Sequence, residues 1–510
     1  MAKTNLKLNT RTHNITPTAI WKNLRQDWLI SVEPNALTPT SQSDAWFNQV
    51  AARRTQLENY SAKLPRLRHF KPKVLIAEAD PTQFLAGFWA ALLAGWDIAL
   101  ANPHWGHQEW SRASYLIQPT VVWASSSPLA QISTQSIQTL EKCTHTPLPS
   151  LSTDESLILI PTGGSSGQVK FACHHWQTLT IAAIGFCNYF GSGKPISSYC
   201  VLPLYHVSGL MQAIRTLVSG GQLLLASLND IEIATNSLRS KSAFISLVPT
   251  QLERLLRADQ AKQLRQFEGV LLGGAPSWRS LLNRAASNRI PVCLSYGMTE
   301  TAAMVTVTDA DAFLEANGQM STSGQTMSHA DIQIEKDGEQ LPVGEVGQVV
   351  VRSPAVARGY YSASLPAFGQ NTFYTDDLGY LDVDGHLHIS GRISHKIISG
   401  GENIFPDEVE AALRATHQVS DVYVLGLPDK EWGEVVAAAY VPTDESVSPA
   451  SLKHALSSAS DSPSEFVPDL ALKEVSRLSH YKHPKRWLAL GTLPRNAQGK
   501  INRAALLNLF

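Results

Sequence analysis

The sequence has no excess of charge of either sign. It contains 42 Lys and Arg residues against 43 Asp and Glu residues, which gives a formal net charge of −1 over 510 residues. A protein that is drawn to nucleic acid or anionic lipid by its overall field needs a basic surplus. We therefore expect no nucleic-acid partner, and any phosphate ligand has to be held by a local arrangement of groups.

Cysteine is scarce, and its spacing excludes two structural roles. The five cysteines are odd in number, lie far apart and form no Cys-x-x-Cys pair. A disulfide framework or a structural zinc site is built from closely spaced or paired thiols. We expect reduced, mostly buried thiols and a cytoplasmic protein. The cysteines are Cys143, Cys173, Cys187, Cys200 and Cys293.

Long hydrophobic runs are also missing. The most apolar stretch extends from Phe84 to Trp96, which falls short of the roughly 20 residues that a membrane-spanning helix needs. We interpret it as a buried helix that leads into a buried strand. The first residues have no apolar core of a secretory signal. The sequence thus predicts no integral membrane segment.

The apolar segments that are present indicate an α/β protein. At roughly 100–200 residues per domain, the length predicts two to four domains. Short apolar runs recur between amphipathic stretches, a pattern typical of buried and largely parallel strands. The runs are VLIAEA, DIALAN, TVVWAS, LILIPT, CVLPLY, QLLLAS, AFISLV and GVLLGG.

The pattern changes twice towards the C-terminus. From about Ile332, apolar and polar residues alternate around Asp337-Gly338 and Asp384-Gly385, which predicts antiparallel hairpins. Beyond residue 395, NIFPDEVEAALRAT has helical spacing, and VSDVYVLGLPD and EVVAAAYVPT resemble strands. The Ser-rich segment 444–466 predicts a loop or a weakly ordered insertion. We place a domain boundary near residues 391–395.

The segment Ile160–Lys170 carries the strongest chemical signal. Three glycines allow backbone N–H groups to approach an anion, three hydroxyls add donors, and Lys170 supplies a positive charge. This pattern favours a phosphate-binding loop over an ordinary Gly/Ser turn. It is not a P-loop, because no lysine directly follows the last glycine. The candidate residues are Thr162, Gly163, Gly164, Ser165, Ser166, Gly167 and Lys170.

Seven further motifs follow this loop in order. They are Pro203–His206, Gly273–Pro276, Tyr296–Glu300, Tyr374–Asp377, Gly391–Arg392, Ser399–Asn403 and Pro494–Lys500. In this order and spacing they resemble the adenylate-forming superfamily of acyl-CoA synthetases, adenylation domains and luciferases. The resemblance extends from about Phe84 to the C-terminus.

The resemblance implies a fold, a reaction and its cofactors. The fold is a large N-terminal domain (1–391) of packed mixed and parallel sheets with helices and a small β-barrel-like part, a hinge (392–394), and a small, mobile α+β domain (395–510). Such enzymes attack the α-phosphate of ATP with a carboxylate and then pass the acyl group to a thiol. ATP, Mg²⁺ and a small carboxylic acid are the implied ligands. No carrier region follows Lys500, so we expect coenzyme A as the acceptor.

The resemblance also assigns the nucleotide site. Asp377 matches the carboxylate that accepts both ribose hydroxyls, Arg392 a ribose or phosphate contact, and Ala275 with Tyr296 the adenine surface. Glu300 matches a magnesium ligand, assisted by Ser166, although Thr299-Glu300 could instead cap a helix. The remaining members of the set are Gly274, Pro276, Gly297, Met298 and Thr299.

Lys500 matches the lysine that reaches from the small domain to the carboxylate and the α-phosphate, where it offsets their repulsion. Without this context it would be a solvated side chain. Ser394 corresponds to the hinge pivot. Ser399, Gly400 and Gly401 lie where a second face of the small domain lines the coenzyme A channel.

The acyl pocket is assigned in finer detail. LPLYHVSGLMQAIRTLVSGG, SLVPTQLERLL, VLLGGAP and YGMTETAAMV look most like the members that activate o-succinylbenzoate for menaquinone or phylloquinone. His206 would gate the pocket, unless it is an ordinary core histidine. The second carboxylate of this substrate needs a cation in an otherwise apolar pocket. Arg215 is the candidate unless it lies on a helix surface, and Ser208 and Thr301 are possible hydroxyl donors.

The sequence departs from the superfamily pattern at three points. Val169-Lys170-Phe171 replaces Pro-Lys-Gly after the loop. Asp376 replaces a glycine before Asp377, which places a second carboxylate beside the ribose site. Ile393-Ser394-His395 stands where acidic hinge residues are common. These departures leave open a catalytically lapsed acyl-adenylate binder, and the pocket leaves open another aryl- or fatty-acyl-CoA ligase. An ATPase or kinase would form ADP instead of AMP.

Overall fold

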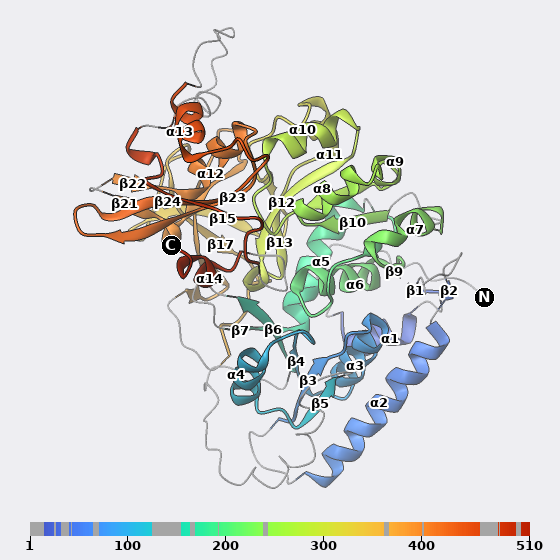
Figure 1. Cartoon of the computed structure of the whole chain (residues 1–510). Helices are drawn as coiled ribbons and strands as arrows, with labels where there is room; N and C mark the ends of the chain where they lie inside the picture. The colour runs from blue at the N-terminus through green and yellow to red at the C-terminus, as the bar shows by residue number, and fades with distance from the viewer. Residues whose placement is uncertain are drawn as a thin grey trace.

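The computed structural model describes residues 15–24, 27–31, 40–41, 43–64, 71–124, 155–163, 169–191, 193–237, 243–361, 367–399, 402–458, 478, 480–495 and 501–510. Figure 1 shows a large part formed by the blue-to-yellow segments and a smaller orange-to-red part at the upper left. The large part contains three sheets, and the smaller part contains a fourth.

The first sheet carries the strands that flank the predicted phosphate loop. Its order is β5-β3-β4-β6-β7, and its pairs are parallel except for the antiparallel pair β6–β7. The strands are β3 (Lys73–Ala77), β4 (Asp97–Leu100), β5 (Val121–Ala124), β6 (Leu157–Gly163) and β7 (Val169–His175). The helices connected with it are α2 (Ser43–Lys63), α3 (Pro81–Leu93) and α4 (His107–Ile117).

The second sheet is larger and mixed. Its order is β14-β13-β12-β11-β10-β8-β9-β1-β2. The strands are β1 (Leu29–Ser31), β2 (Thr40–Ser41), β8 (Ser197–Cys200), β9 (Leu223–Leu225), β10 (Ala243–Leu247), β11 (Gly269–Leu272), β12 (Val292–Met298), β13 (Ala303–Val307) and β14 (Gln325–Thr326). The helices of this region are α1 (Pro17–Asn23), α5 (Trp176–Phe190), α6 (Val207–Ser219), α7 (Ile231–Ser237), α8 (Pro249–Arg257), α9 (Ala261–Leu264), α10 (Arg279–Ser287) and α11 (Ala310–Glu315), with 3-10 turns η4 (Leu228–Asp230) and η5 (Thr299–Thr301).

Helices α3, α5 and α6 pack between these two sheets. One continuous apolar core joins Val74 and Ile158 of the first sheet to Leu223 of the second through the buried faces of these helices. Helix α3 begins where Asp80 accepts a hydrogen bond from the N–H of Gln83 and a proline occupies the first turn. This central layer holds α6 in place, and α6 carries the predicted acyl-pocket residues.

The third sheet is antiparallel and half-barrel-like. Its path is β16-β15-β17-β19-β18, and β20 pairs with β19. The strands are β15 (Asp331–Lys336), β16 (Glu339–Gln340), β17 (Gly347–Arg352), β18 (Phe368–Gly369), β19 (Thr372–Leu381) and β20 (Leu387–Arg392). Strand β20 ends at Arg392, and the 3-10 turn η6 (Ile393–His395) follows directly. The third sheet thus leads straight into the predicted hinge.

The smaller part has a core of its own. Its sheet has the order β22-β21-β24-β23, and β25 pairs with β24. Its buried cluster contains only residues from Ile397 onward. The elements are β21 (Ile397–Ser399), β22 (Glu402–Ile404), α12 (Pro406–Ala415), β23 (Val419–Asp429), β24 (Gly433–Pro442), α13 (Pro449–Ser458), η8 (His480–Lys482), β25 (Arg486–Ala489) and α14 (Arg503–Leu507).

Most of the predicted elements are present. Seven of the eight apolar runs contain strands, whereas CVLPLY contributes only Cys200 to β8 and continues as a turn. Most of Phe84–Trp96 is the buried helix α3 leading into β4, and both Asp-Gly turns join antiparallel strands. The four described cysteines are free and buried, and Cys143 lies outside the described residues. No helix of the described chain is long and apolar enough to cross a membrane.

One predicted loop is wrong in part. Residues 449–458 of the Ser-rich segment form helix α13. Leu452 and Leu456 are four residues apart, so they lie on one face of the helix, and both are buried in the core of the small part. Ser448 and Ser451 exchange side-chain to backbone hydrogen bonds at the start of the helix. The serines therefore cap a helix whose two leucines fix it to the domain.

Candidate active site

The adenine side of the candidate site lies at the carboxyl ends of two parallel strands. Because β11 and β12 are parallel partners, both leave the sheet at the same edge, where open α/β sheets bind ligands. In the turn after β11, Gly274 has a φ of 79°, which residues with a Cβ rarely adopt. A Cβ on Gly273 would lie 2.6 Å from Oγ of Ser295. The turn that contains Ala275 is therefore packed against β12, next to Tyr296.

Tyr296, Asp377 and Arg392 form one hydrogen-bonded group. The Tyr296 hydroxyl donates to Oδ2 of Asp377 at 2.7 Å, and Nε of Arg392 donates to Oδ1 at 3.0 Å. Asp377 and Arg392 are opposite each other on β19 and β20. Asp377 is buried, whereas Arg392 is half exposed. Two donors from different sheets thus fix the orientation of the carboxylate that is predicted to accept the ribose hydroxyls.

The pKa values of Tyr296 and Arg392 are both raised, so both groups stay protonated and remain hydrogen-bond donors to Asp377. Burial, together with the neighbouring Asp377 carboxylate, raises the pKa of Tyr296 well above its usual value, so the phenol remains a donor. Burial alone would lower the pKa of Arg392, but the carboxylates of Asp377 and Asp376 outweigh it and raise that pKa. The guanidinium therefore stays charged beside the nucleotide site.

Glu300 is buried in η5 and is connected to the strand that follows the phosphate loop. The hydroxyl of Tyr360 donates to Oε1 of Glu300 at 2.6 Å. Nζ of Lys170 lies 5.4 Å from the centroid of the Tyr360 ring, within the range of a cation–π contact. Lys170 is paired with Thr162 across the β6–β7 ladder. One tyrosine thus bridges the predicted magnesium ligand and the predicted phosphate lysine.

The chemistry of these residues fits a magnesium ion, which Glu300 would hold. A carboxylate is the ligand that Mg²⁺ prefers in nucleotide sites, where the phosphates and water complete its coordination. Glu300 supplies that carboxylate at the end of the loop strands, and its hydrogen bond to Tyr360 limits its orientation. Glu300 does not cap a helix in this structure. Gly164, Ser165, Ser166 and Gly167 lie outside the described residues.

The turn that carries Glu300 is held by a buried histidine. Nε2 of His174 donates to the carbonyl of Thr299 at 2.7 Å, and its Nδ1 lies 2.9 Å from the hydroxyl of Thr178. Burial lowers the pKa of His174 to about 4, so the ring is neutral at pH 7. A Cβ on Gly297 would lie only 1.8 Å from the carbonyl of Ala303. The close approach of β12 to β13 therefore requires glycine at this position.

The predicted acyl residues are arranged along helix α6. His206 is the residue before the helix, and Arg215 lies more than two turns further along. At 1.5 Å per residue, these positions are roughly 13 Å apart along the helix axis. Arg215 is buried, not on a helix surface, and its guanidinium lies 4.2 Å from the centroid of the Phe186 ring. Together with apolar groups it lines a small cavity, formed also by Phe186, Met211, Ala302, Ala303, Met304 and Met327.

Arg215 has unused hydrogen-bonding capacity. Its Nε donates to the carbonyl of Met211 at 3.1 Å, but Nη1 has no hydrogen-bond partner among the described residues. Burial lowers its pKa to about 10, which still leaves the group charged at pH 7. The neighbouring Thr301 hydroxyl is engaged within its own turn, by Met298 and Ala303. Ser208 is half-buried in the first turn of α6.

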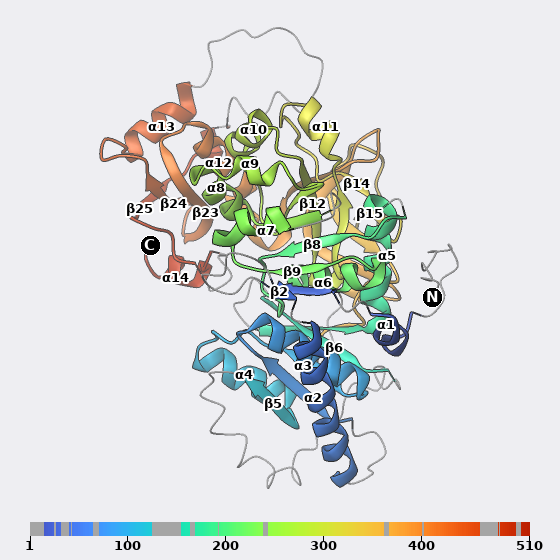
Figure 2. The same cartoon turned by 90° about the vertical axis from the view of Figure 1, so that its right-hand side faces the viewer.

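Among the residues predicted to act from the small part, the structure describes Ser399. Lys500, Gly400 and Gly401 lie outside the described residues. On either side of Lys500, Arg495 and Ile501 form an isolated antiparallel bridge. Helix α14 lies between the small part and the large part in both views (Figures 1 and 2). Ser399 is on β21, which Figure 1 shows at the outer side of the small part, away from β12.

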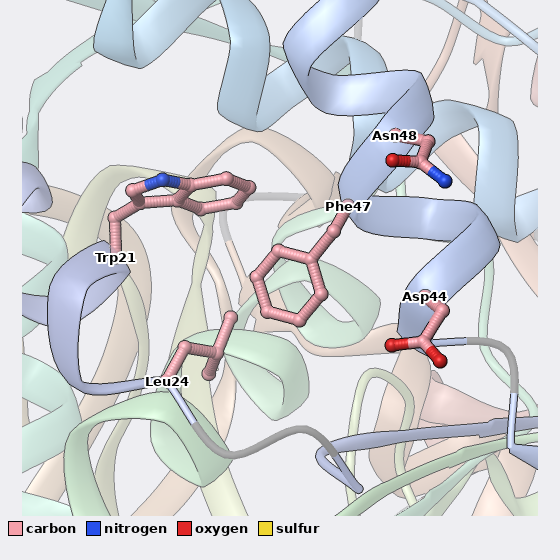
Figure 3. Close-up of a pocket in the computed structure, with 5 residues that line it drawn as sticks. All are labelled: Trp21, Leu24, Asp44, Phe47 and Asn48. Carbon is pink, nitrogen blue, oxygen red and sulfur yellow. The ribbon is translucent and has the colours of Figure 1, made fainter.

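A further pocket lies away from these residues. It is open to solvent, and it is lined by Trp21, Leu24, Asp44, Phe47 and Asn48 (Figure 3). The Phe47 ring lies 5.0 Å from that of Trp21. None of the predicted site residues lines it, and it belongs to helices α1 and α2 at the N-terminal end.

Two residues of the site were not found by inspection of the sequence. Tyr360 and His174 stand outside the motifs, and their partners Glu300 and Thr299 are 60 and 125 residues away in the chain. In the sequence, the role of His174 is indicated only by the pair His174-His175, two polar residues at the end of the apolar segment that forms β7. Their roles depend on the isolated bridge between Ala172 and Tyr360, which no local pattern predicts.

Comparison with known families identifies the class. The sequence matches the family described as AMP-binding enzyme over residues 66–361, and the AMP-binding enzyme C-terminal domain over residues 408–500. The chain belongs to the AMP-binding enzyme family, the adenylate-forming superfamily whose motifs the sequence resembles. Its fold is the one expected for that family.

Particular relatives are similar over most of the chain. The 2-succinylbenzoate–CoA ligase of Bacillus licheniformis is 32% identical over 366 residues, covering 71% of this chain and 72% of the relative. The o-succinylbenzoate CoA synthetase of Bacillus subtilis, in complex with its acyl-adenylate intermediate, superposes with a TM-score of 0.77 at 25% identity, covering 94% and 95% of the two chains. The same enzyme with ATP and magnesium gives 0.75 at 25% identity, covering 94% and 96%.

The similarity also depends on the state of the relative. A double mutant of the Bacillus subtilis enzyme, bound to a product analogue that contains coenzyme A, gives a TM-score of only 0.63, although 96% and 97% of the chains are covered at 24% identity. The chain as a whole is therefore more similar in shape to the acyl-adenylate complex.

Proposed function

We propose that this chain is an ATP-dependent, AMP-forming acid–thiol ligase that converts 2-succinylbenzoate to 2-succinylbenzoyl-CoA in menaquinone or phylloquinone biosynthesis. Its family and its similarity to 2-succinylbenzoate–CoA ligases support the reaction. The observation that carries the choice of acid is Arg215, a buried cation in an otherwise apolar cavity, whose Nη1 has no hydrogen-bond partner in the described part of the chain. A free donor of this kind suits a substrate with a second carboxylate.

In the first half-reaction, the carboxylate of the succinyl side chain attacks the α-phosphorus of ATP. The bond from the α-phosphorus to the bridging oxygen breaks, and pyrophosphate leaves with the electron pair. Thr162, Lys170 and the loop between them hold the phosphates, and Glu300 would hold a magnesium ion, which would supply positive charge to offset theirs. Lys500 supplies positive charge where the two anions meet.

The nucleoside is held by the group around Asp377. Its carboxylate accepts the ribose hydroxyls, while Tyr296 and Arg392 keep it oriented. The adenine ring lies against the turn at Ala275. Because this geometry exists before the ligand arrives, little reorganisation is needed when the nucleotide binds.

The acid lies along helix α6. Its ring carboxylate pairs with Arg215, and its succinyl carboxylate reaches the α-phosphate near His206. The spacing of these two residues along the helix supports this orientation, because the two carboxylates of the acid would then lie at opposite ends of the pocket. His206 gates the pocket and is not a general base, since a carboxylic acid is already ionised at pH 7.

In the second half-reaction, the thiol of coenzyme A attacks the acyl carbon and AMP leaves. We propose that residues 395–510 rotate about the hinge at Ser394, relative to residues 1–391, and bring the Ser399–Gly401 face to the site. The distant position of β21 in the present arrangement supports this step. The buried free thiols support a reducing compartment, the cytoplasm.

A panel of acids tests the proposal. The protein is incubated with ATP, Mg²⁺, coenzyme A and either 2-succinylbenzoate, simple aryl acids or fatty acids, and AMP and thioester are measured by mass. We expect AMP and thioester in equal amounts, with 2-succinylbenzoate strongly preferred. Preference for an aryl or fatty acid would refute the choice of substrate. ADP formation, or the absence of pyrophosphate release with every acid, would refute the ligase activity itself.

A further inference from the structure

Two departures from the family pattern meet in the structure. Asp376 stands where glycine is usual, and Ser394 stands where an acidic hinge residue is usual. The backbone N–H of Ser394 donates to Oδ1 of Asp376 at 3.0 Å, and the Ser394 hydroxyl donates to Oδ2 of the same carboxylate. One carboxylate therefore holds the hinge residue through two hydrogen bonds.

The placement of Asp376 follows from strand geometry. Successive residues of a strand point to opposite faces, and Asp376 and Asp377 are neighbours on β19. Asp377 is buried and contacts Tyr296 and Arg392, whereas Asp376 is exposed and faces the hinge. Asp376 is therefore not directed at the ribose site, contrary to the expectation from the sequence. An acidic residue at position 394 would repel this carboxylate, while serine offers it a donor.

We propose that Asp376 is a positioning residue that latches the hinge in the adenylate-forming arrangement and must release Ser394 before coenzyme A can react. This proposal rests on the proposed function. Two observations support the arrangement assigned to the latched state. The chain is more similar to the acyl-adenylate complex than to the coenzyme A product-analogue complex. Burial, and then the charges of Arg392 and of Arg503 at the start of α14, lower the pKa of His395. Helix α14 therefore begins near the hinge.

The latch acts on the balance between the two arrangements. Rotation of the small domain changes the backbone angles of residues 393–395, so the N–H of Ser394 cannot keep its direction towards β19. Breaking the contact removes stabilisation from the adenylate-forming arrangement only. The population of the thioester-forming arrangement then rises. Thioester formation therefore becomes faster, both when rotation of the small domain limits its rate and when the chemical step does. The first half-reaction needs no release of the latch.

Single-turnover kinetics test this proposal with three variants. Asp376→Ala removes both hydrogen bonds, Ser394→Ala removes only the one from the hydroxyl, and the double variant removes both. We expect thioester formation from preformed adenylate to be about two- to tenfold faster in Asp376→Ala, while pyrophosphate release in the absence of coenzyme A is not accelerated. Ser394→Ala should give a smaller effect of the same sign. The double variant should equal Asp376→Ala, because the two residues act through one contact.

The controls separate a latch from a structural or charge effect. Ser394→Thr keeps the hydroxyl and should retain wild-type kinetics, and Glu339→Ala removes an exposed carboxylate elsewhere on the same sheet and should change neither rate. An unchanged ratio of the two half-reactions in Asp376→Ala, or additive effects in the double variant, would overturn the proposal.

Limited trypsin digestion gives a readout that needs no turnover. Arg392 and Lys396 flank the hinge, and cleavage there requires the local backbone to open. In the ligand-free protein, we expect faster cleavage at these sites in Asp376→Ala and Ser394→Ala than in the wild type. Equal cleavage rates would count against the latch even if 2-succinylbenzoate proves to be the wrong acid. Absence of ligase activity together with faster cleavage would refute the proposed function and leave the latch in place.

Discussion

Arg215→Met should weaken substrate binding and at the same time stabilise the free protein. Methionine replaces the aliphatic stem of arginine but lacks the charged guanidinium, and the cavity already contains Met211, Met304 and Met327. The substitution therefore removes the cation while leaving the apolar lining intact. Loss of the buried guanidinium charge is thus expected both to lower the affinity for the substrate and to raise the stability of the free protein.

The magnitudes follow from the burial of the guanidinium. Burial lowers the pKa of Arg215 from 12.5 to about 10, and a shift of this size corresponds to about 3 kcal/mol of unfavourable charge burial in the free protein. The cation–π contact with Phe186 and the hydrogen bond to Met211 offset part of it. In the complex, a ring carboxylate without its partner costs about 3 kcal/mol or more, which is roughly a hundredfold in affinity.

Two measurements on two acids test this reasoning. The KM for 2-succinylbenzoate and the thermal unfolding midpoint are compared for the wild type, Arg215→Met and the exposed control Arg265→Met. We expect a KM about a hundredfold higher and a higher unfolding midpoint for Arg215→Met only. An analogue without the ring carboxylate should bind both proteins with similar affinity. If Arg215→Met leaves the KM for 2-succinylbenzoate unchanged, or weakens both acids equally, the carboxylate partner is not Arg215.

Three further predictions concern other parts of the molecule. Tyr360→Phe removes the donor that orients Glu300, so the Mg²⁺ concentration for half-maximal pyrophosphate release should rise about tenfold; an unchanged Mg²⁺ dependence would exclude this role. Lys500→Ala should slow adenylate formation far more than thiolation of preformed adenylate, because its charge is needed where the carboxylate meets the phosphate; equal slowing would contradict it. Burial raises the pKa of Glu410 from 4.5 to about 8, so the folded state binds this proton more tightly than the unfolded state does. The stabilisation that results is complete below pH 4.5 and is lost as the pH rises towards 8. Thermal unfolding from pH 5 to 8 should show a smaller decline in Glu410→Gln, by up to about 1.4 kcal/mol per pH unit, and identical slopes would refute it.

The sequence alone predicted the strands and the family because both are encoded in contiguous segments. Short buried runs rich in β-branched and aliphatic residues, such as LILIPT, favour strands, and the sheet interior pairs their backbone groups. The glycines of the motifs mark places where backbone passes close to backbone, as Gly297 does beside Ala303. Patterns of this kind depend on neighbours in the chain, so they can be read without the fold.

The contacts that complete the site could not be predicted in this way. The Tyr360–Glu300 bond and the His174–Thr299 bond join segments that only the tertiary structure brings together. Asp376 looked like a second acid beside the ribose, and only the direction of its side chain on β19 connects it with Ser394. Helix α13 was missed because serine is a weak helix former, and burial of two leucines decided the outcome.

The antiparallel pairing of β6 and β7 has a consequence for product release. In P-loop proteins the phosphate loop leads into a helix, whose N-terminal dipole is a fixed source of positive potential. Here the loop between Gly163 and Val169 leads into a strand, and strands contribute only a small dipole. At the predicted phosphate site, the positive potential would then come from side chains and a divalent ion, which can move or depart with pyrophosphate. A site that holds phosphates through mobile side chains and a dissociable ion can release pyrophosphate between the two half-reactions. A fixed helix dipole would oppose that release.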